Sequence, residues 1–144
     1  MKYVLDTNVV SAIRNPRKNP TPAAWVARIP LSELYITTPT VAELGLGVAA
    51  KERTDPTQGK VFRDWFDLQV LAAFGDRILP FDLAAAQILS TYRVPEHAPY
   101  DDALIAAIAQ ANNMTIVTRN IKHFQPLGVA CINPWETTTT RRVI

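Results

Sequence analysis

Short apolar runs that alternate with longer helix-like segments are the feature that most restricts the fold of this chain. Such runs are typical of strands covered on both faces, and strand–helix alternation favours parallel pairing. The sequence therefore predicts an α/β sandwich with a central, mainly parallel sheet of four to five strands. The expected strands are residues 3–5, 34–38, 77–79, 115–118 and 130–132.

Helix patterns fill the intervals between these runs. Asp6 and its two neighbours are good N-caps for a short helix, and Thr38 and Asp82 are the expected caps of two later ones. Proline residues at 20, 22 and 39 stand where a first helical turn tolerates them. The expected helices cover residues 9–13, 22–29, 39–48, 54–73, 84–92 and 103–111.

Length and composition indicate one globular domain. The chain has 144 residues, of which 48% are hydrophobic and 19% charged, and its formal net charge is +2. Its single cysteine excludes an internal disulfide and fits a reducing cytosol. No apolar run approaches the ~20 residues that span a membrane, and the N-terminus does not resemble a signal peptide. We expect a domain over 1–135 and a polar tail over 136–144.

Acidic residues stand where the carboxyl ends of parallel strands meet, which is the usual place for a site. Asp6 directly follows the first strand, and Thr118 to Asn120 follow the fourth. Glu43 lies in the first turns of the helix after the second strand, and Asp102 begins the helix before the fourth. We therefore expect three carboxylates from distant segments to converge.

Convergent carboxylates repel one another and need a cation or raised pKa values. Hard oxygen ligands without a His or Cys cluster favour Mg²⁺ or Mn²⁺ over zinc. Each acid also has a plainer interpretation: Asp6 as an N-cap, Asp102 as a favourable charge in a first helical turn, and Glu43 as part of a wet helix face. Gly45 and Gly47 weaken the helix of Glu43, which suggests that something packs closely against its backbone.

Four segments together resemble a known family, the PIN-domain nucleases, and in particular the toxin subunit of VapBC-type or FitAB-type toxin–antitoxin pairs. Any one of these motifs is weak, but their order and separations over almost the whole chain are specific. They are residues 4–11 (VLDTNVVS), 40–44 (TVAEL) with Gly47, 102–107 (DALIAA), and 117–120 (VTRN) with Phe124, Gly128-Val129 and 132–135 (INPW). Residues 78–82 (ILPFD) also have the family's character.

The resemblance implies a three-layer α/β/α sandwich and a prokaryotic, cytoplasmic ribonuclease toxin that hydrolyses RNA with Mg²⁺ or Mn²⁺. It implies that Asp6, Glu43 and Asp102 are the catalytic, metal-binding acids. Thr7, Asn8, Thr118 and Asn120 would be supporting polar groups, with Ser11 as another. The implied partners are RNA, a small antitoxin, and a second copy in a homodimer or a toxin–antitoxin hetero-oligomer; no membrane is implied.

The chain departs from the family pattern after the fourth strand, where a fourth acid is usual. Asn120 and His123 occupy the two candidate positions, so that no acid stands there. Asp101 is a possible substitute, although its side chain should project about 100° away from that of Asp102 around a helix. This departure puts a second metal ion in doubt.

Several cationic residues are candidates for guiding an RNA backbone, and Arg119 is the best placed because its segment adjoins the expected site. For most of the others a solvated surface is the plainer interpretation. They are Arg14, Arg17, Lys18, Lys51, Arg53 and Lys122.

Three alternative functions stay open at this point. A PIN fold with an impaired site would act only as a binding module through its partner, and it should bind Mn²⁺ poorly. A phosphatase with an aspartate nucleophile needs a second acid two residues later, where Asn8 stands. Cleavage of DNA uses the same metal chemistry, and only the family resemblance favours RNA.

Overall fold

Five parallel strands form one central sheet in the computed structural model, which describes residues 1–136. Their order across the sheet is β3-β2-β1-β4-β5, and every neighbouring pair is parallel, which confirms the predicted sheet. The chain runs outward from β1 through β2 to β3, and then returns to the other side of β1 for β4 and β5. The strands are β1 (Tyr3–Leu5), β2 (Leu34–Thr37), β3 (Ile78–Leu79), β4 (Thr115–Val117) and β5 (Cys131–Ile132).

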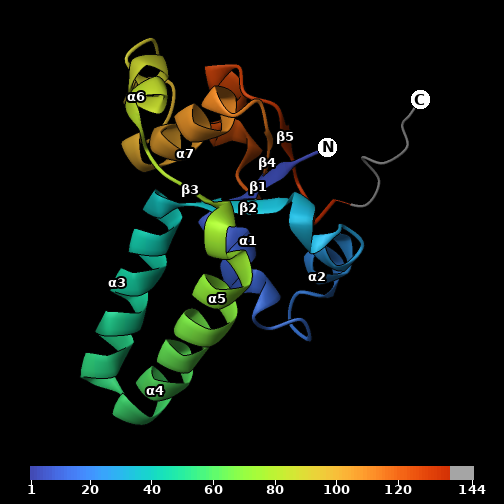
Figure 1. Cartoon of the computed structure of the whole chain (residues 1–144), viewed down its shortest axis with the longest axis vertical. Coiled ribbons are helices and arrows are strands. Elements are labelled where there is room, and N and C mark those ends of the chain that lie inside the picture. Colours follow the sequence, from blue (N-terminus) through green and yellow to red (C-terminus); the bar gives the residue numbers. More distant parts are fainter. Residues whose placement is uncertain (137–144) are drawn as a thin grey trace.

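Helices cover both faces of this sheet, as Figure 1 shows: α6 and α7 lie on one side, and α1, α3, α4 and α5 lie on the other. The α-helices are α1 (Thr7–Ile13), α2 (Pro20–Ala27), α3 (Thr38–Thr54), α4 (Pro56–Asp64), α5 (Ala72–Phe74), α6 (Leu83–Leu89) and α7 (Tyr100–Ala111). A π-helical segment (Trp65–Leu71) joins α4 to α5, and short 3₁₀ turns cover Leu31–Glu33, Gly75–Arg77, Ile121–His123 and Gln125–Leu127. The three-layer α/β/α prediction is therefore confirmed.

Alternation along the strands divides the core into two main layers. In β1, Leu5 packs into a cluster with α1, α3 and the π-helical segment, whereas its neighbour Val4 packs against α7. In β4, Val117 and Ile116 divide in the same way, because successive side chains of a strand point to opposite faces. The strands are thus buried on both sides, as their continuous apolar runs indicated.

Several predicted boundaries move by a few residues. Thr37 rather than Thr38 caps α3, and its hydroxyl accepts the Thr40 N–H at 3.3 Å. Helix α7 begins at Tyr100, so that Asp101 and Asp102 lie inside its first turn. The single helix expected over 54–73 begins at 56 and widens to π geometry from residue 65. Residues 137–144, most of the predicted polar tail, lie outside the described part of the chain.

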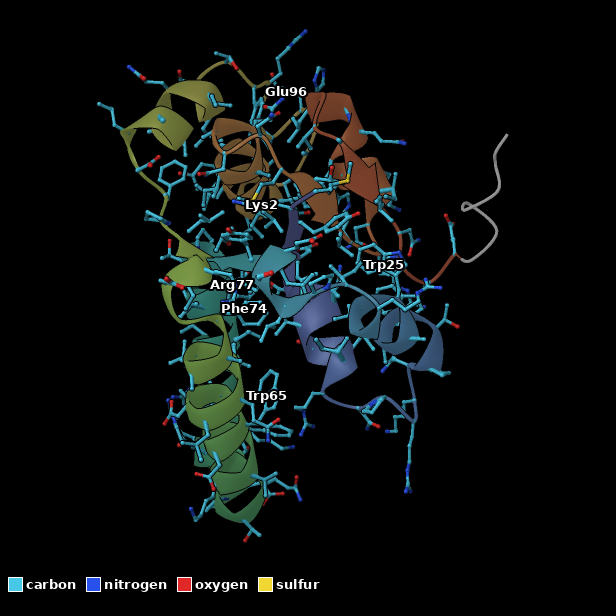
Figure 2. The ribbon with its side chains drawn as sticks, turned by 45° about the vertical axis from the view of Figure 1, so that its right-hand side comes forward. Lys2, Trp25, Trp65, Phe74, Arg77 and Glu96 are labelled. Atoms are coloured by element: carbon cyan, nitrogen blue, oxygen red, sulfur yellow. The ribbon has the colours of Figure 1, made fainter. Side chains whose placement is uncertain are left out.

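Two tryptophans on helical faces pack against the core from different sides of α1 (Figure 2). Trp25 of α2 stacks edge-on against Tyr3, with 5.1 Å between the ring centroids. Trp65 lines an apolar cavity of about 240 Å³ together with Val10 and Ile13 of α1.

Within residues 1–136, no helix is long and apolar enough to cross a membrane.

The prediction that another segment packs closely against the backbone at Gly45 and Gly47 is wrong. Such a close contact occurs at a different glycine, Gly59. A Cβ atom added at Gly45 would make an ordinary contact with Phe66 at 3.6 Å, and one at Gly47 would meet nothing within 4 Å. At Gly59 of α4 the added atom would stand 2.5 Å from the Cα atom of Glu52 on α3. Only hydrogen fits between these two helix backbones.

Gly59→Ala is therefore expected to lower the free energy of unfolding by about 1–3 kcal/mol, because α3 and α4 must separate to admit the methyl group. Gly47→Ala is the matched control: it should raise stability by up to about 1 kcal/mol, because alanine favours a helix interior and the site is open. Urea unfolding of both variants measures the difference. Equal effects of the two substitutions would contradict the close contact.

Candidate active site

The candidate site lies beyond the carboxyl ends of β1 and β4, at the point where the order of the strands reverses. Asp6 follows β1 and Thr118 follows β4, and the backbone N–H of Asp6 donates to the carbonyl of Val117 at 2.9 Å. The Thr118 hydroxyl donates to Oδ2 of Asp6 at 2.8 Å. Strand pairing alone therefore brings together residues that are 112 positions apart in the chain.

Asp6 is the most buried acid of this site, with 3% of its surface exposed. Besides Thr118, the Thr7 backbone N–H donates to its Oδ1 atom at 2.8 Å, and the Asn8 side-chain amide donates to Oδ2 at 3.3 Å. The first of these bonds makes Asp6 the N-cap of α1. All three donors are neutral, so they orient the carboxylate without balancing its charge.

Glu43 reaches the site from α3. The Thr7 hydroxyl donates to its Oε1 atom at 2.8 Å, and the buried Thr40 hydroxyl lies 3.0 Å from that of Thr7. Because the single hydroxyl proton of Thr7 is committed to Glu43, Thr40 is the donor in this pair. A chain of two hydroxyls thus ties α3 to the first turn of α1 and holds the carboxylate.

Asp102 reaches the site from the first turn of α7. Its Oδ2 atom lies 2.7 Å from Nδ1 of His123, which belongs to the 3₁₀ turn after β4. The two side chains are 20% and 31% exposed, so this contact is partly shielded from water. His123 therefore lies beside one of the predicted acids, a role that the sequence analysis did not assign to it.

The three predicted acids line one cavity of about 530 Å³. The supporting residues Thr7, Asn8 and Asn120 line it too, as do Ser11 and Arg119, whereas Thr118 lies behind Asp6 and acts on it by hydrogen bonding. Its lining residues are Asp6, Thr7, Asn8, Ser11, Ala12, Asn19, Glu43, Asp102, Arg119, Asn120 and Trp135.

Burial and like charge act on the acids of this cavity. Burial raises the pKa of Asp6 from 3.8 to about 6; the Thr118 and Thr7 hydrogen bonds oppose this shift, and the charges of Asp102 and Glu43 add to it. Burial also raises the pKa of Asp102, against the lowering effect of the His123 contact. Within residues 1–136, neither Asp6 nor Glu43 forms an ion pair with a cationic side chain.

A hard divalent cation fits this donor set. The cavity lining carries three carboxylates and one cationic side chain, Arg119, which leaves negative charge without a counter-charge. In the described part of the chain, no three acidic, histidine or cysteine side chains form a tight ligand cluster. Mg²⁺ keeps several waters and is commonly bound through one or two carboxylates, so an open arrangement of acids suits it and does not suit zinc.

Two side chains near the site lie differently from what their sequence position suggested. Asp101 is not among the residues that line the cavity of the three acids; it lines a second cavity with Glu43, Leu46 and Leu104, and its charge helps to raise the pKa of Asp102. Arg119 lies over the ring of Trp135, with 4.9 Å from its Cζ atom to the ring centroid. Of the cationic candidates, only Arg119 belongs to the cavity lining.

Sequence reasoning missed several residues of the site: Asn19, Thr40, His123 and Trp135. Asn19 precedes α2 and bonds back to the carbonyl of Ala12 at 3.3 Å. Thr40 and Trp135 stood inside recognised motifs, which was a usable signal. The sequence analysis considered position 123 only as one where an acid is missing. It did not consider that the histidine there could form a hydrogen bond to one of the predicted acids.

Comparisons with known proteins agree with this fold. Ribonuclease VapC14 of Mycobacterium tuberculosis (strain CDC 1551 / Oshkosh) is 53% identical over 74 residues, which are 51% of this chain and 72% of that protein. Toxin FitB of Neisseria gonorrhoeae (strain ATCC 700825 / FA 1090) is 34% identical, over 92% of this chain and 98% of its own length.

A solved structure of FitAB bound to an IR36 DNA fragment contains a similar chain. It is 33% identical and superimposes with a TM-score of 0.85, covering 93% of this chain and 96% of that one. The model of the PIN domain family matches residues 3–126, which include all three carboxylates. The parallel sheet, the acids at its carboxyl edge and these matches together show that this chain belongs to the PIN-domain family.

Proposed function

We propose that this protein is a Mg²⁺- or Mn²⁺-dependent ribonuclease that acts as the toxin of a type II toxin–antitoxin pair. The observation that carries the proposal is the single cavity lined by Asp6, Glu43 and Asp102 without a balancing set of cations. The names of two relatives, Ribonuclease VapC14 and Toxin FitB, support both parts of it.

In this proposal Asp6, Glu43 and Asp102 hold the ion, and RNA is hydrolysed beside it. The oxygen of a water molecule forms a bond to phosphorus, the bond to the ribose oxygen breaks, and a proton from the water ends on that leaving oxygen. A divalent ion bound there supplies positive charge for the phosphate and acidifies the water. The protein contributes the placement of charges before the reaction begins.

Neutral hydrogen-bond donors perform this placement. Thr118 and the Thr7 amide hold Asp6, and the Thr7 hydroxyl holds Glu43, so that neither carboxylate has to reorient when the substrate arrives. At neutral pH Asp6 is mostly ionised, since its pKa is about 6. Arg119 is exposed at the cavity and is the side chain that we assign to the RNA backbone.

The proposed partners are a small antitoxin and a second copy of this chain. The solved FitAB complex supports the antitoxin, because its toxin-like chain resembles this one over almost its full length. Two large apolar side chains on the helices are exposed and available to a partner: Leu46 of α3 is 74% exposed and Leu68 of the π-helical segment is 70% exposed.

Asp102→Asn is expected to lower the rate of RNA cleavage by at least about 10²-fold, because a charge aimed at the reacting centre is lost. Asp101→Asn is the matched control: it removes the charge of the next residue, which does not line the cavity of the three acids although it shares a second cavity with Glu43, and it should leave the rate within a few-fold. The measurement is cleavage of structured RNA by antitoxin-free protein with Mn²⁺ and with EDTA.

Equal loss in both variants would show that local charge, and not this carboxylate, matters. Cleavage that survives EDTA or Asp102→Asn would contradict the proposed site. The other candidate function, an inactive PIN-fold module that only binds its partner, is favoured by Asn120 and His123 in place of acids. Folded wild-type protein that neither cleaves RNA nor binds Mn²⁺ would establish that alternative.

A further inference from the structure

The contact between His123 and Asp102 differs from the other described contacts of the three acids because the partner is an imidazole, and not a hydroxyl, a side-chain amide or a backbone N–H. Asp102 lies on α7, and His123 ends the 3₁₀ turn Ile121–His123 after β4. The turn is fixed from both sides: the backbone N–H of His123 donates to the carbonyl of Asn120 at 2.9 Å, and the next residue, Phe124, is fully buried. The imidazole therefore approaches Asp102 from a rigid base.

The chemistry of the pair sets the direction of the hydrogen bond. An ionised carboxylate accepts and cannot donate, so Nδ1 of His123 carries the proton and donates to Oδ2 of Asp102 at 2.7 Å. A carboxylate that accepts no such bond rotates broadly about its last side-chain torsion. The contact removes this freedom and occupies one lone pair of Oδ2.

We propose that His123 is a positioning residue that presents the Asp102 carboxylate to one divalent ion, and that it restricts the site to that single ion. This inference rests on the proposed function. It gives each of the three acids a dedicated donor: Asp6 has Thr118, Glu43 has Thr7, and Asp102 has His123. Partners that hold metal-binding side chains in this way commonly control affinity.

The restriction to one ion follows from what the segment after β4 provides. Two-metal sites hold their ions roughly 3.5–4 Å apart and need further acidic ligands for the second one. Here Asn120 lines the cavity as a neutral amide. Nδ1 of His123 carries a proton that it donates to Asp102, so this nitrogen cannot bind a cation. Asp101 is absent from the lining of this cavity and lines a second one beside Glu43, so it does not take the place of an acid after β4.

Calorimetric titration of the full-length protein with Mn²⁺ tests both parts. We expect wild type to bind one ion, and His123→Ala to bind it about 10–100-fold more weakly. His123→Phe keeps a ring but has no donor, and it should bind Mn²⁺ as weakly as His123→Ala is expected to. It serves as the test variant if His123→Ala folds poorly. His123→Asn places an amide N–H close to the former Nδ1 position and should restore most of the affinity. His97→Ala is the matched control, since His97 is the only other histidine and lies exposed in a loop.

Nuclear magnetic resonance of the metal-free protein supplies a readout that does not depend on binding. With two histidines in the chain, their ring signals are readily distinguished. The Nδ1 proton of His123 should exchange slowly and lie downfield, and Asp102→Asn should shift it while leaving the His97 signals unchanged. Unchanged His123 signals in Asp102→Asn would contradict the hydrogen bond on which the inference rests.

The outcomes separate this inference from the proposed function. Two Mn²⁺ ions bound to wild type, or unchanged affinity in His123→Ala and His123→Phe, would overturn the inference while RNA cleavage could still be present. One ion bound, with the expected loss and its rescue by asparagine but without RNA cleavage, would support His123 and overturn the ribonuclease. Wild type that binds no Mn²⁺ would overturn both.

Discussion

Replacement of Asp6 by asparagine is expected to abolish RNA cleavage and, at the same time, to make the metal-free protein more stable at neutral pH. The carboxylate is 3% exposed, its hydrogen-bond donors are neutral, and two other acids line the same cavity. Its negative charge is therefore unfavourable in the metal-free fold and useful only with a cation present. We expect a loss of cleavage of at least about 10²-fold.

The stability change has a defined pH dependence. Folding raises the pKa of Asp6 from 3.8 to about 6, so between these values the folded protein binds more protons than the unfolded chain. The free energy of unfolding consequently falls as the pH rises through this window, by about 3 kcal/mol in total. Asp6→Asn should remove that fall. At pH 7.5 its free energy of unfolding should therefore exceed that of wild type by about 1–3 kcal/mol, the lower values applying if the asparagine forms weaker hydrogen bonds than the carboxylate.

Urea unfolding in EDTA from pH 4 to pH 8 measures this effect. Asp82→Asn is the control, because Asp82 caps α6 through the Ala85 N–H at 3.0 Å but is exposed, and asparagine caps a helix equally well. Saturating Mn²⁺ should stabilise wild type, by about 2.7 kcal/mol at 100 times its dissociation constant, and should barely affect Asp6→Asn. If Asp6→Asn instead destabilised the metal-free protein, Asp6 would be primarily a structural cap.

Phe124→Ala is expected to have the largest effect on stability, a loss of about 3–5 kcal/mol. Phe124 is the bulkiest of the fully buried side chains in residues 1–136, and it packs with Val4, Ile116 and α7. A domain of this kind is stable by only about 5–15 kcal/mol in all, so the variant should be close to unfolding. The substitution also loosens the turn that carries His123.

Urea unfolding again provides the measurement, with Leu83→Ala as the control. Leu83 is 74% exposed on α6, and truncating it should change the free energy of unfolding by no more than about 0.5 kcal/mol. A loss below 1 kcal/mol in Phe124→Ala would mean that the core on the α7 side collapses around the missing ring.

The strands were predictable because their signal is local. The runs at 3–5 and 115–118 are apolar and end at polar caps, and the structure confirms strands at Tyr3–Leu5 and Thr115–Val117. The helix over 54–73 was partly wrong for the same reason. Apolar residues at helical spacing fit α and π geometry alike, so the widening over Trp65–Leu71 left no trace in the pattern.

The close contact between helices was predicted at the wrong glycines, because the presence of a glycine in the sequence does not show which atoms lie next to it in the fold. Gly45 and Gly47 drew attention as weak points of a helix, yet the tight contact occurs where Gly59 meets the backbone of Glu52. Such a contact depends on how two helices cross, and each helix alone carries no record of it.

By itself, the sequence determined the order of strands and helices, the parallel character of the sheet, and the placement of Asp6, Glu43 and Asp102 at ends that such a sheet brings together. These follow from periodicity and from the rule that parallel strands share a carboxyl edge. Only the tertiary structure decided which neighbours those acids meet. Trp135 comes beside Arg119, and His123 comes beside Asp102, because the order of the strands and the packing of α7 set distances between segments that no local pattern encodes.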